Sequence, residues 1–187
     1  MPGYYSYLVS SLPTLQFGMP PPFLMEDYLL MMEGFIPGNE VETIHQFVLE
    51  QYSPELLKVK MIADFFACEA AIRNHLARLR SADRDISPEK FVRSLEVLID
   101  QRMEQSALDA YKTENLLESE KMLDLARWKY LDELATGHVF DFNTLLIYAM
   151  KLRILRKWQV ITEADKNMIF NATVESFKLQ DVPISRS

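Results

Sequence analysis

Two residue pairs in the sequence have the residue types and the spacing that could support chemistry. The first pair could bind a metal. Glu42 and His45 form a Glu-x-x-His, which in di-iron helical bundles places a carboxylate and an imidazole on one helix face. Such a site needs a second Glu-x-x-His and two more glutamates on facing helices. The other histidines, His75 and His138, follow an Ile and an Ala at that offset. We therefore expect no metal, and surface positions for Glu42 and His45.

The second pair, Cys68 and His75, could form a nucleophile with its base. The two residues are seven positions apart and would share one face of a helix, but about 10 Å of axial rise would separate them. They could not hydrogen-bond directly. Cys68 is flanked by small and apolar residues, which predicts a core position: Phe66, Ala67, Ala70 and Ala71.

Glycine is too scarce for the usual phosphate-binding loops. Gly137 is the sole glycine after Gly38, so neither G-x-x-x-x-G-K-[ST] nor G-x-G-x-x-G can occur in that stretch. The sequence thus predicts no catalytic residues, no cofactor and no enzyme activity.

Charge is divided unevenly along the 187 residues, whose formal net charge is −7. Residues 1–57 contain seven acids and no Lys or Arg, whereas the rest of the chain balances 20 acids against 20 bases. Basic residues cluster near the ends of two predicted helices. They either complement the helix dipole or form docking surfaces, for an acidic partner or for the acidic segment itself. The candidate interface residues are Glu26, Asp27, Glu33, Glu40, Glu42, Arg73, Arg78, Arg80, Lys151, Arg153 and Lys157.

Composition narrows the class of protein. Apolar residues make up 49% of the chain, enough for a core, and the pI near 5.0 argues against nucleic-acid binding. No apolar run approaches the ~18 residues of a membrane helix. A single cysteine and a start without a basic region favour a cytoplasmic location, with no direct membrane insertion.

Apolar periodicity and capping residues predict an all-α fold, an irregular bundle of about seven helices in a single domain, 1–187. Residues 1–38 form a Pro- and Gly-rich segment, 39–180 the helical body and 181–187 a frayed tail. Residues 4–12 suit a short strand, with an amphipathic helix as the alternative. The expected helices cover 24–33, 40–51, 54–80, a stretch from 88, then 113–136, 141–158 and 162–179. Their start signals are Ser53-Pro54-Glu55, Ser87-Pro88-Glu89, Thr113, Asp141 and the capping box Thr162–Asp165, and Gly137 ends one of them.

Three stretches resemble a family of small bacterial proteins of unknown function. They are YYSYLVSSLPTLQFG (4–18), EAAIRNHLARLR (69–80) and the long segment 118–158. The last contains the most specific block, in which Arg127, Trp128, Tyr130, Leu131, Asp132, Glu133 and Leu134 match together.

This resemblance implies a context. Genes of that family typically lie in V/A-type ATPase operons of bacteria without a recognisable C-type subunit. That subunit is the all-helical socket between the rotor shaft and the membrane ring, and we call it the socket subunit. Phe140 to Leu146, followed by Lys151 and Arg153, is similar to a degenerate copy of the helical repeat of that subunit. A distant similarity to the repeat would place helix 54–80 beside helix 141–158. The socket subunit is much longer and has three repeats, and no catalytic residues carry over.

The leading hypothesis is a non-catalytic, soluble subunit or accessory protein of a V/A-type ATPase, with a central-stalk docking role like that of the socket subunit. Its partners would be rotor-shaft or membrane-ring subunits, and it would be peripheral to the inner membrane through the complex. An alternative is a transient assembly or regulatory factor for that ATPase. A second alternative is a small helical ligand-binding protein or enzyme.

Overall fold

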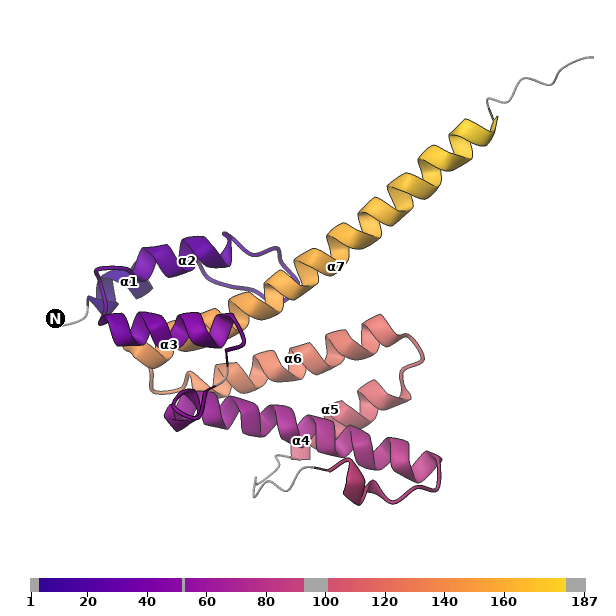
Figure 1. Cartoon of the computed structure of the whole chain (residues 1–187), viewed down its shortest axis with the longest axis horizontal. Helices are drawn as coiled ribbons and strands as arrows, with labels where there is room; N and C mark the ends of the chain where they lie inside the picture. Colours follow the sequence, from indigo (N-terminus) through magenta and orange to yellow (C-terminus); the bar gives the residue numbers. More distant parts are fainter. Residues whose placement is uncertain (1–3, 52, 93–100, 181–187) are drawn as a thin grey trace, which may run out of the picture.

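The computed structural model describes residues 4–51, 53–92 and 101–180, and all its regular structure is helical (Figure 1). The predicted all-α class, with about seven helices, is confirmed for these residues. In chain order the elements are α1 (Tyr5–Ser11), α2 (Met25–Met32), α3 (Gly38–Val48), the 3-10 turn η1 (Leu56–Lys58), α4 (Lys60–Asp83), the 3-10 turn η2 (Pro88–Lys90), α5 (Gln101–Lys112), α6 (Leu116–Leu134) and α7 (Phe142–Gln180).

The short strand considered for residues 4–12 is wrong, because this stretch forms α1. Leu8 is buried, and Tyr5, Val9 and Leu12 pack against the same core. These positions recur at the three- and four-residue spacing of a helix face, so burial selects the helix over a strand's alternation.

The predicted helix 54–80 is divided in two. Its start signal acts as expected, since the Ser53 hydroxyl accepts a hydrogen bond from the Leu56 backbone N–H at 3.2 Å. The turn that follows is only η1, because the backbone at Val59 is extended, with ψ of 109°. The long helix α4 then begins at Lys60, and Leu56 is buried in the core beside Phe47.

The predicted boundaries around α6 are partly wrong. Thr113 does not cap α6, because its hydroxyl donates back to the Asp109 carbonyl in α5 at 2.9 Å. Asn115 is the cap, and its side-chain oxygen accepts from two backbone N–H groups of the first turn. At the other end Gly137 adopts a φ of +88°, as a glycine that ends a helix should.

One uninterrupted helix, α7, replaces the two predicted for 141–158 and 162–179. Asp141 caps it as expected, accepting from the Thr144 N–H at 2.9 Å. Thr162 and Asp165 do not start a new helix, since both lie exposed within the one that begins at Phe142. Of the helix predicted from 88, the structure contains η2 and α5, and residues 93–100 lie outside the described residues.

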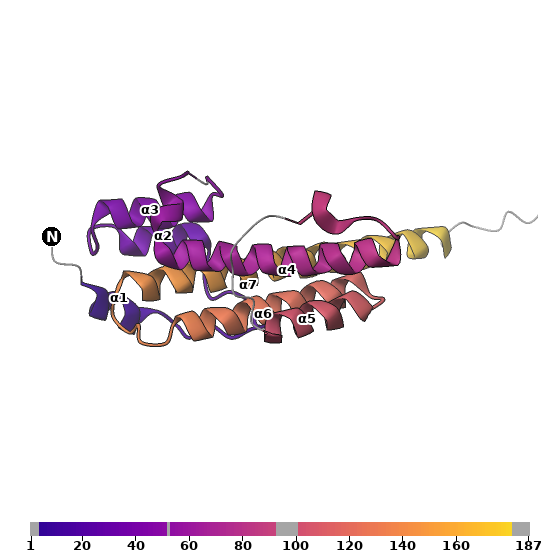
Figure 2. The ribbon, with the colours of Figure 1, turned by 90° about the horizontal axis from the view of Figure 1, so that it is seen from below.

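Two apolar clusters form the core. The first surrounds the most deeply buried residues of α2, α3 and α7, including Tyr28, Phe47 and Leu145. The second lies between α4, α5 and α6, around Ile72 and Ala107. Figures 1 and 2 show α4, α6 and the first half of α7 side by side, with the second half of α7 extending past the other helices.

Replacing Tyr28 with Phe tests how α2 is fixed on α7. The buried Tyr28 hydroxyl donates to the Leu145 carbonyl at 2.6 Å. We expect Tyr28→Phe to lower the free energy of unfolding by about 1 kcal/mol, measured by urea titration with an unchanged slope. Tyr4→Phe is the control, because the Tyr4 ring is 60% exposed. Equal stability of the two variants would contradict the role of this bond.

Alkaline pH gives a second test of the same group. Burial raises the pKa of Tyr28 well above its ordinary value of 10.0, so the folded chain keeps a proton that the unfolded chain releases. The contribution of Tyr28 to the free energy of unfolding is therefore fully present below pH 10. Above that pH it falls by about 1.4 kcal/mol per pH unit. The advantage of wild type over Tyr28→Phe should vanish by about pH 11 in unfolding titrations. A difference that stays constant from pH 8 upward would contradict it.

Candidate functional site

A network of charged side chains joins α4, α6 and α7, and its centre is the buried Asp124 of α6. One carboxylate oxygen of Asp124 accepts from Arg127 at 2.7 Å, within the same helix. The other accepts from Lys157 at 2.7 Å and from the indole N–H of Trp158 at 2.8 Å, both on α7. The Asp124 side chain is only 3% exposed, so these bonds replace the water it lost on folding.

Arg127 extends the network to α4. Its Nε donates to Glu69 at 2.5 Å, and Glu120 lies 3.3 Å from Arg127 while accepting from Lys157 at 2.5 Å. Burial opposes the charge on Arg127, but the carboxylates of Glu69 and Asp124 outweigh it and raise the pKa of the guanidinium above its usual range. Every buried side-chain nitrogen and oxygen among the described residues has a hydrogen-bond partner. The buried atoms of the network therefore all have partners, which suits a structural role.

Cys68 is a core residue, as the sequence indicates. It is 5% exposed, and its Sγ lies 4.0 Å from the sulfur of Met103. Burial, with a smaller contribution from Glu69, raises the pKa of the Cys68 thiol to about 12. The thiolate needed for nucleophilic chemistry is thus disfavoured at neutral pH.

Glu42 and His45 lie on the surface of α3. Glu42 accepts a hydrogen bond from Gln46 at 2.8 Å, and His45 Nδ1 lies 3.9 Å from the Glu42 carboxylate. Within residues 4–51, 53–92 and 101–180, no group of three or more His, Cys, Asp or Glu side chains is placed to hold a metal ion.

The basic candidates on α7 form ion pairs within the monomer. Lys151 donates to Asp132 of α6 at 2.5 Å, and Lys157 belongs to the Asp124 network. Arg153 lies 3.0 Å from Glu50, an ion pair between this helix and the acidic segment.

The basic candidates on α4 are more exposed. Arg73 approaches Glu69 at 3.7 Å with a side chain that is 64% exposed. Arg78 and Arg80 lie exposed in the last turns of the helix.

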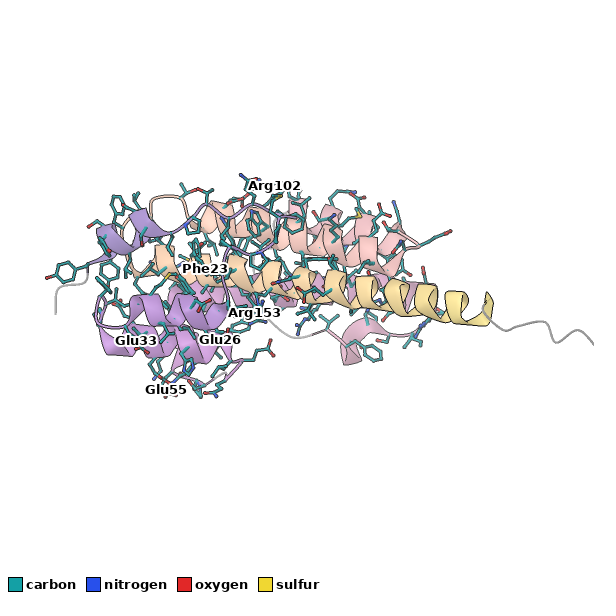
Figure 3. The ribbon with its side chains drawn as sticks, turned by 90° about the horizontal axis from the view of Figure 1, so that it is seen from above. Phe23, Glu26, Glu33, Glu55, Arg102 and Arg153 are labelled. Carbon is teal, nitrogen blue, oxygen red and sulfur yellow. The ribbon has the colours of Figure 1, made fainter. Side chains whose placement is uncertain are left out.

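The acidic candidates point mostly to solvent. Glu40 accepts from the Tyr5 hydroxyl, and Asp27 accepts from the Leu24 N–H at 3.2 Å at the start of α2. Glu26 and Glu33 are exposed and make no hydrogen bond or ion pair with the described residues. Figure 3 shows Glu26 and Glu33 on the α2–α3 side of the molecule, away from Arg102. These two acids therefore do not pair with the basic helix ends in the described part of the chain.

Exposed apolar residues of α2 and of the turn after it neighbour these acids along the chain, and the start of α1 packs on that turn. We call this combined set the acidic–aromatic face. Tyr7 and Phe35 stack with ring centroids 5.3 Å apart. With Tyr4 and Gly34 they line an open hollow of about 300 Å³. The face consists of Tyr4, Tyr7, Glu26, Asp27, Leu30, Met31, Glu33, Gly34 and Phe35.

Sequence reasoning missed both the network and the aromatic part of this face. The signal for the network was present, because Glu120, Asp124 and Arg127 recur at four- and three-residue spacing on a helix whose neighbouring positions are apolar. The signal for the face was the helical phase of α2, in which buried Tyr28 and Met32 leave Leu30 pointing outward.

These features define a helical protein that is cross-linked by a buried charge network and carries an open acidic and aromatic face. The chain belongs to a family described as protein of unknown function (DUF2764), whose model matches residues 39–180. The match includes α3 to α7 and the whole Asp124 network, whereas α1 and α2 precede it. No curated protein and no solved structure matches the chain.

Removing one charge from the network tests its structural role. Asp124→Asn leaves Lys157 and Arg127 without their shared carboxylate, so we expect a loss of about 3 kcal/mol in the free energy of unfolding. Asp132→Asn is the matched control, since it breaks an ion pair whose carboxylate is 56% exposed and should cost less than about 1 kcal/mol. Similar losses in the two variants, measured by chemical denaturation, would show that the network is not the stronger link.

Proposed function

We propose that this protein is a non-catalytic docking subunit or accessory protein of a V/A-type ATPase, with a role like that of the socket subunit. The observation that carries the docking role is the acidic–aromatic face. It keeps exposed aromatic and aliphatic side chains beside Glu26 and Glu33, two carboxylates with no partner among the described residues. Exposed apolar side chains that gather in one region mark interaction sites in folded proteins.

A non-catalytic role is supported by the state of the reactive groups. The described groups with strongly shifted pKa values are the buried Tyr28, the partly buried Tyr5, Tyr130 and Tyr148, the Cys68 thiol and the ion-paired Arg127. Each is enclosed in the core or bound by a neighbour, so none presents an activated atom to a substrate.

The shape of α7 supports a connecting role. Its 39 residues correspond to about 58 Å of helix, and only the first part packs against α6. Val160 is 58% exposed, and residues 162–165 are exposed too. The helix therefore offers contact positions far from the acidic–aromatic face. None of the described helices combines the length and the apolar run that crossing a bilayer requires.

The proposal that the partner complex is a V/A-type ATPase rests on a sequence resemblance. Residues 4–18, 69–80 and 118–158 resemble proteins encoded with V/A-type ATPases. In the structure, the most specific block of that resemblance lies on α6, where Arg127 and Leu131 are packed between α4 and α7. A helical scaffold similar in kind to the socket subunit would need no cofactor to join two other proteins of the complex.

Co-purification from native membranes tests the proposal. A tagged full chain, expressed at its natural level and extracted gently at low salt, should recover V/A-type ATPase subunits in stoichiometric amounts. An untagged strain is the control. Recovery of no ATPase subunit would overturn the proposal. Recovery of unassembled subunits only, with an assembly defect on deletion, would replace the permanent subunit with an assembly factor.

A further inference from the structure

We propose that the acidic–aromatic face receives a basic amphipathic helix of a partner protein. The inference rests on the proposed docking function and names the chemistry of the partner at that site. Apolar side chains of the helix would enter the hollow, and flanking Lys or Arg side chains would pair with the carboxylates around it.

The apolar part of the face is built before any partner arrives. The Tyr4 backbone N–H donates to the Phe35 carbonyl at 2.8 Å, which fixes the start of α1 on the turn after α2. The Tyr7 and Phe35 rings are nearly parallel, at 18°. Gly34, which lines the hollow, has a φ of +78°, a conformation that favours glycine and turns the chain after α2. A preformed hollow reduces the ordering cost of binding.

The α2 part of the face alternates apolar and acidic side chains. Leu30 is 63% exposed, and Glu26 and Glu33 are its neighbours one helical turn before and after. Met31 is 41% exposed and has Asp27 one turn before it. Leu30 and Met31 therefore each have a carboxylate within one helical turn. A partner helix that covers either apolar side chain also comes close to a carboxylate.

The electrostatic field of this region selects a cationic partner. Residues 1–57 contain no Lys or Arg, and Glu26 and Glu33 have no partner among the described residues. A phospholipid surface rich in anionic lipid or a nucleic acid would be repelled. A second copy that used the same face would place these acids opposite each other. A helix with Lys and Arg beside its apolar stripe satisfies both the charge and the apolar surface.

A defined peptide tests the chemistry directly. The probe is a fluorescent helical peptide of about 18 residues, with Leu on one face and Lys elsewhere, and its counterpart has Glu in place of Lys. We expect the full chain to bind the Lys peptide with an affinity that falls about tenfold or more from low to high salt, and not to bind the Glu peptide. Equal binding of both peptides, or binding of phosphatidylglycerol vesicles in preference to the Lys peptide, would overturn the proposal.

Matched variants locate the binding face. Glu26→Gln with Glu33→Gln should weaken binding about tenfold, and Leu30→Ser should do the same by removing apolar contact. The charge control is Glu42→Gln with Glu55→Gln, and the apolar control is Leu116→Ser, since Leu116 is 82% exposed on α6. Thermal unfolding checks that all variants remain folded. Equal weakening by the controls would place binding elsewhere and contradict the assignment.

The same variants separate this inference from the proposed function. If wild type recovers ATPase subunits from native membranes and the Glu26, Glu33 and Leu30 variants recover them equally well, the docking function holds and the assignment of the face is wrong. If wild type recovers none, the proposed function fails, and the peptide titration still decides whether the face binds basic helices.

Discussion

The buried carboxylate of Asp124 is the constraint on which the arrangement of the three longest helices depends. A carboxylate that is 3% exposed must have its charge compensated and its oxygens hydrogen-bonded, since the cost of leaving it bare is several kcal/mol. The compensation comes from Lys157 and Trp158 on α7 and from Arg127, which in turn holds Glu69 on α4. A shift of α7 by one residue would turn its side chains by about 100° and remove both of its donors. Apolar packing supplies the attraction between these helices, and the network fixes their register.

This division of roles explains where charge remains available on the molecule. Acids of α6 take up cations of α7, so Lys151 and Lys157 contribute to internal cohesion. Glu26 and Glu33, near the two ends of α2, have no such partner in the described part of the chain. The asymmetry visible in the sequence thus becomes a spatial one, between a body whose charges largely neutralise one another and an N-terminal face that keeps a negative field.

Local chemistry could be predicted from the sequence where a side chain acts on its own backbone. Gly137 and Asp141 mark the turn between α6 and α7 correctly, because a left-handed residue and a capping carboxylate work within a few residues. Thr162 carries the same kind of signal but is overridden by continuous helix around it. The part of the Asp124 network within α6 shows in the sequence spacing, but its links to α4 and α7 could not be predicted, since those bonds join residues 33, 34 and 58 positions apart. The acids of the acidic–aromatic face show in the sequence, whereas the exposure of Tyr7 depends on how α1 packs against the turn after α2.

The carboxylates of the acidic–aromatic face affect which surfaces can cover its exposed apolar side chains. Apolar area left in water is unfavourable by roughly 25 cal/mol per Å², which favours its burial against any available surface, including another copy of the chain. Glu26 and Glu33 oppose that outcome, because a like-charged surface would have to bring carboxylates together as it covered Leu30. A cationic surface meets no such barrier and gains from both interactions at once. On the proposed docking face, the acids would therefore oppose a like-charged surface and favour a cationic one over the same apolar side chains.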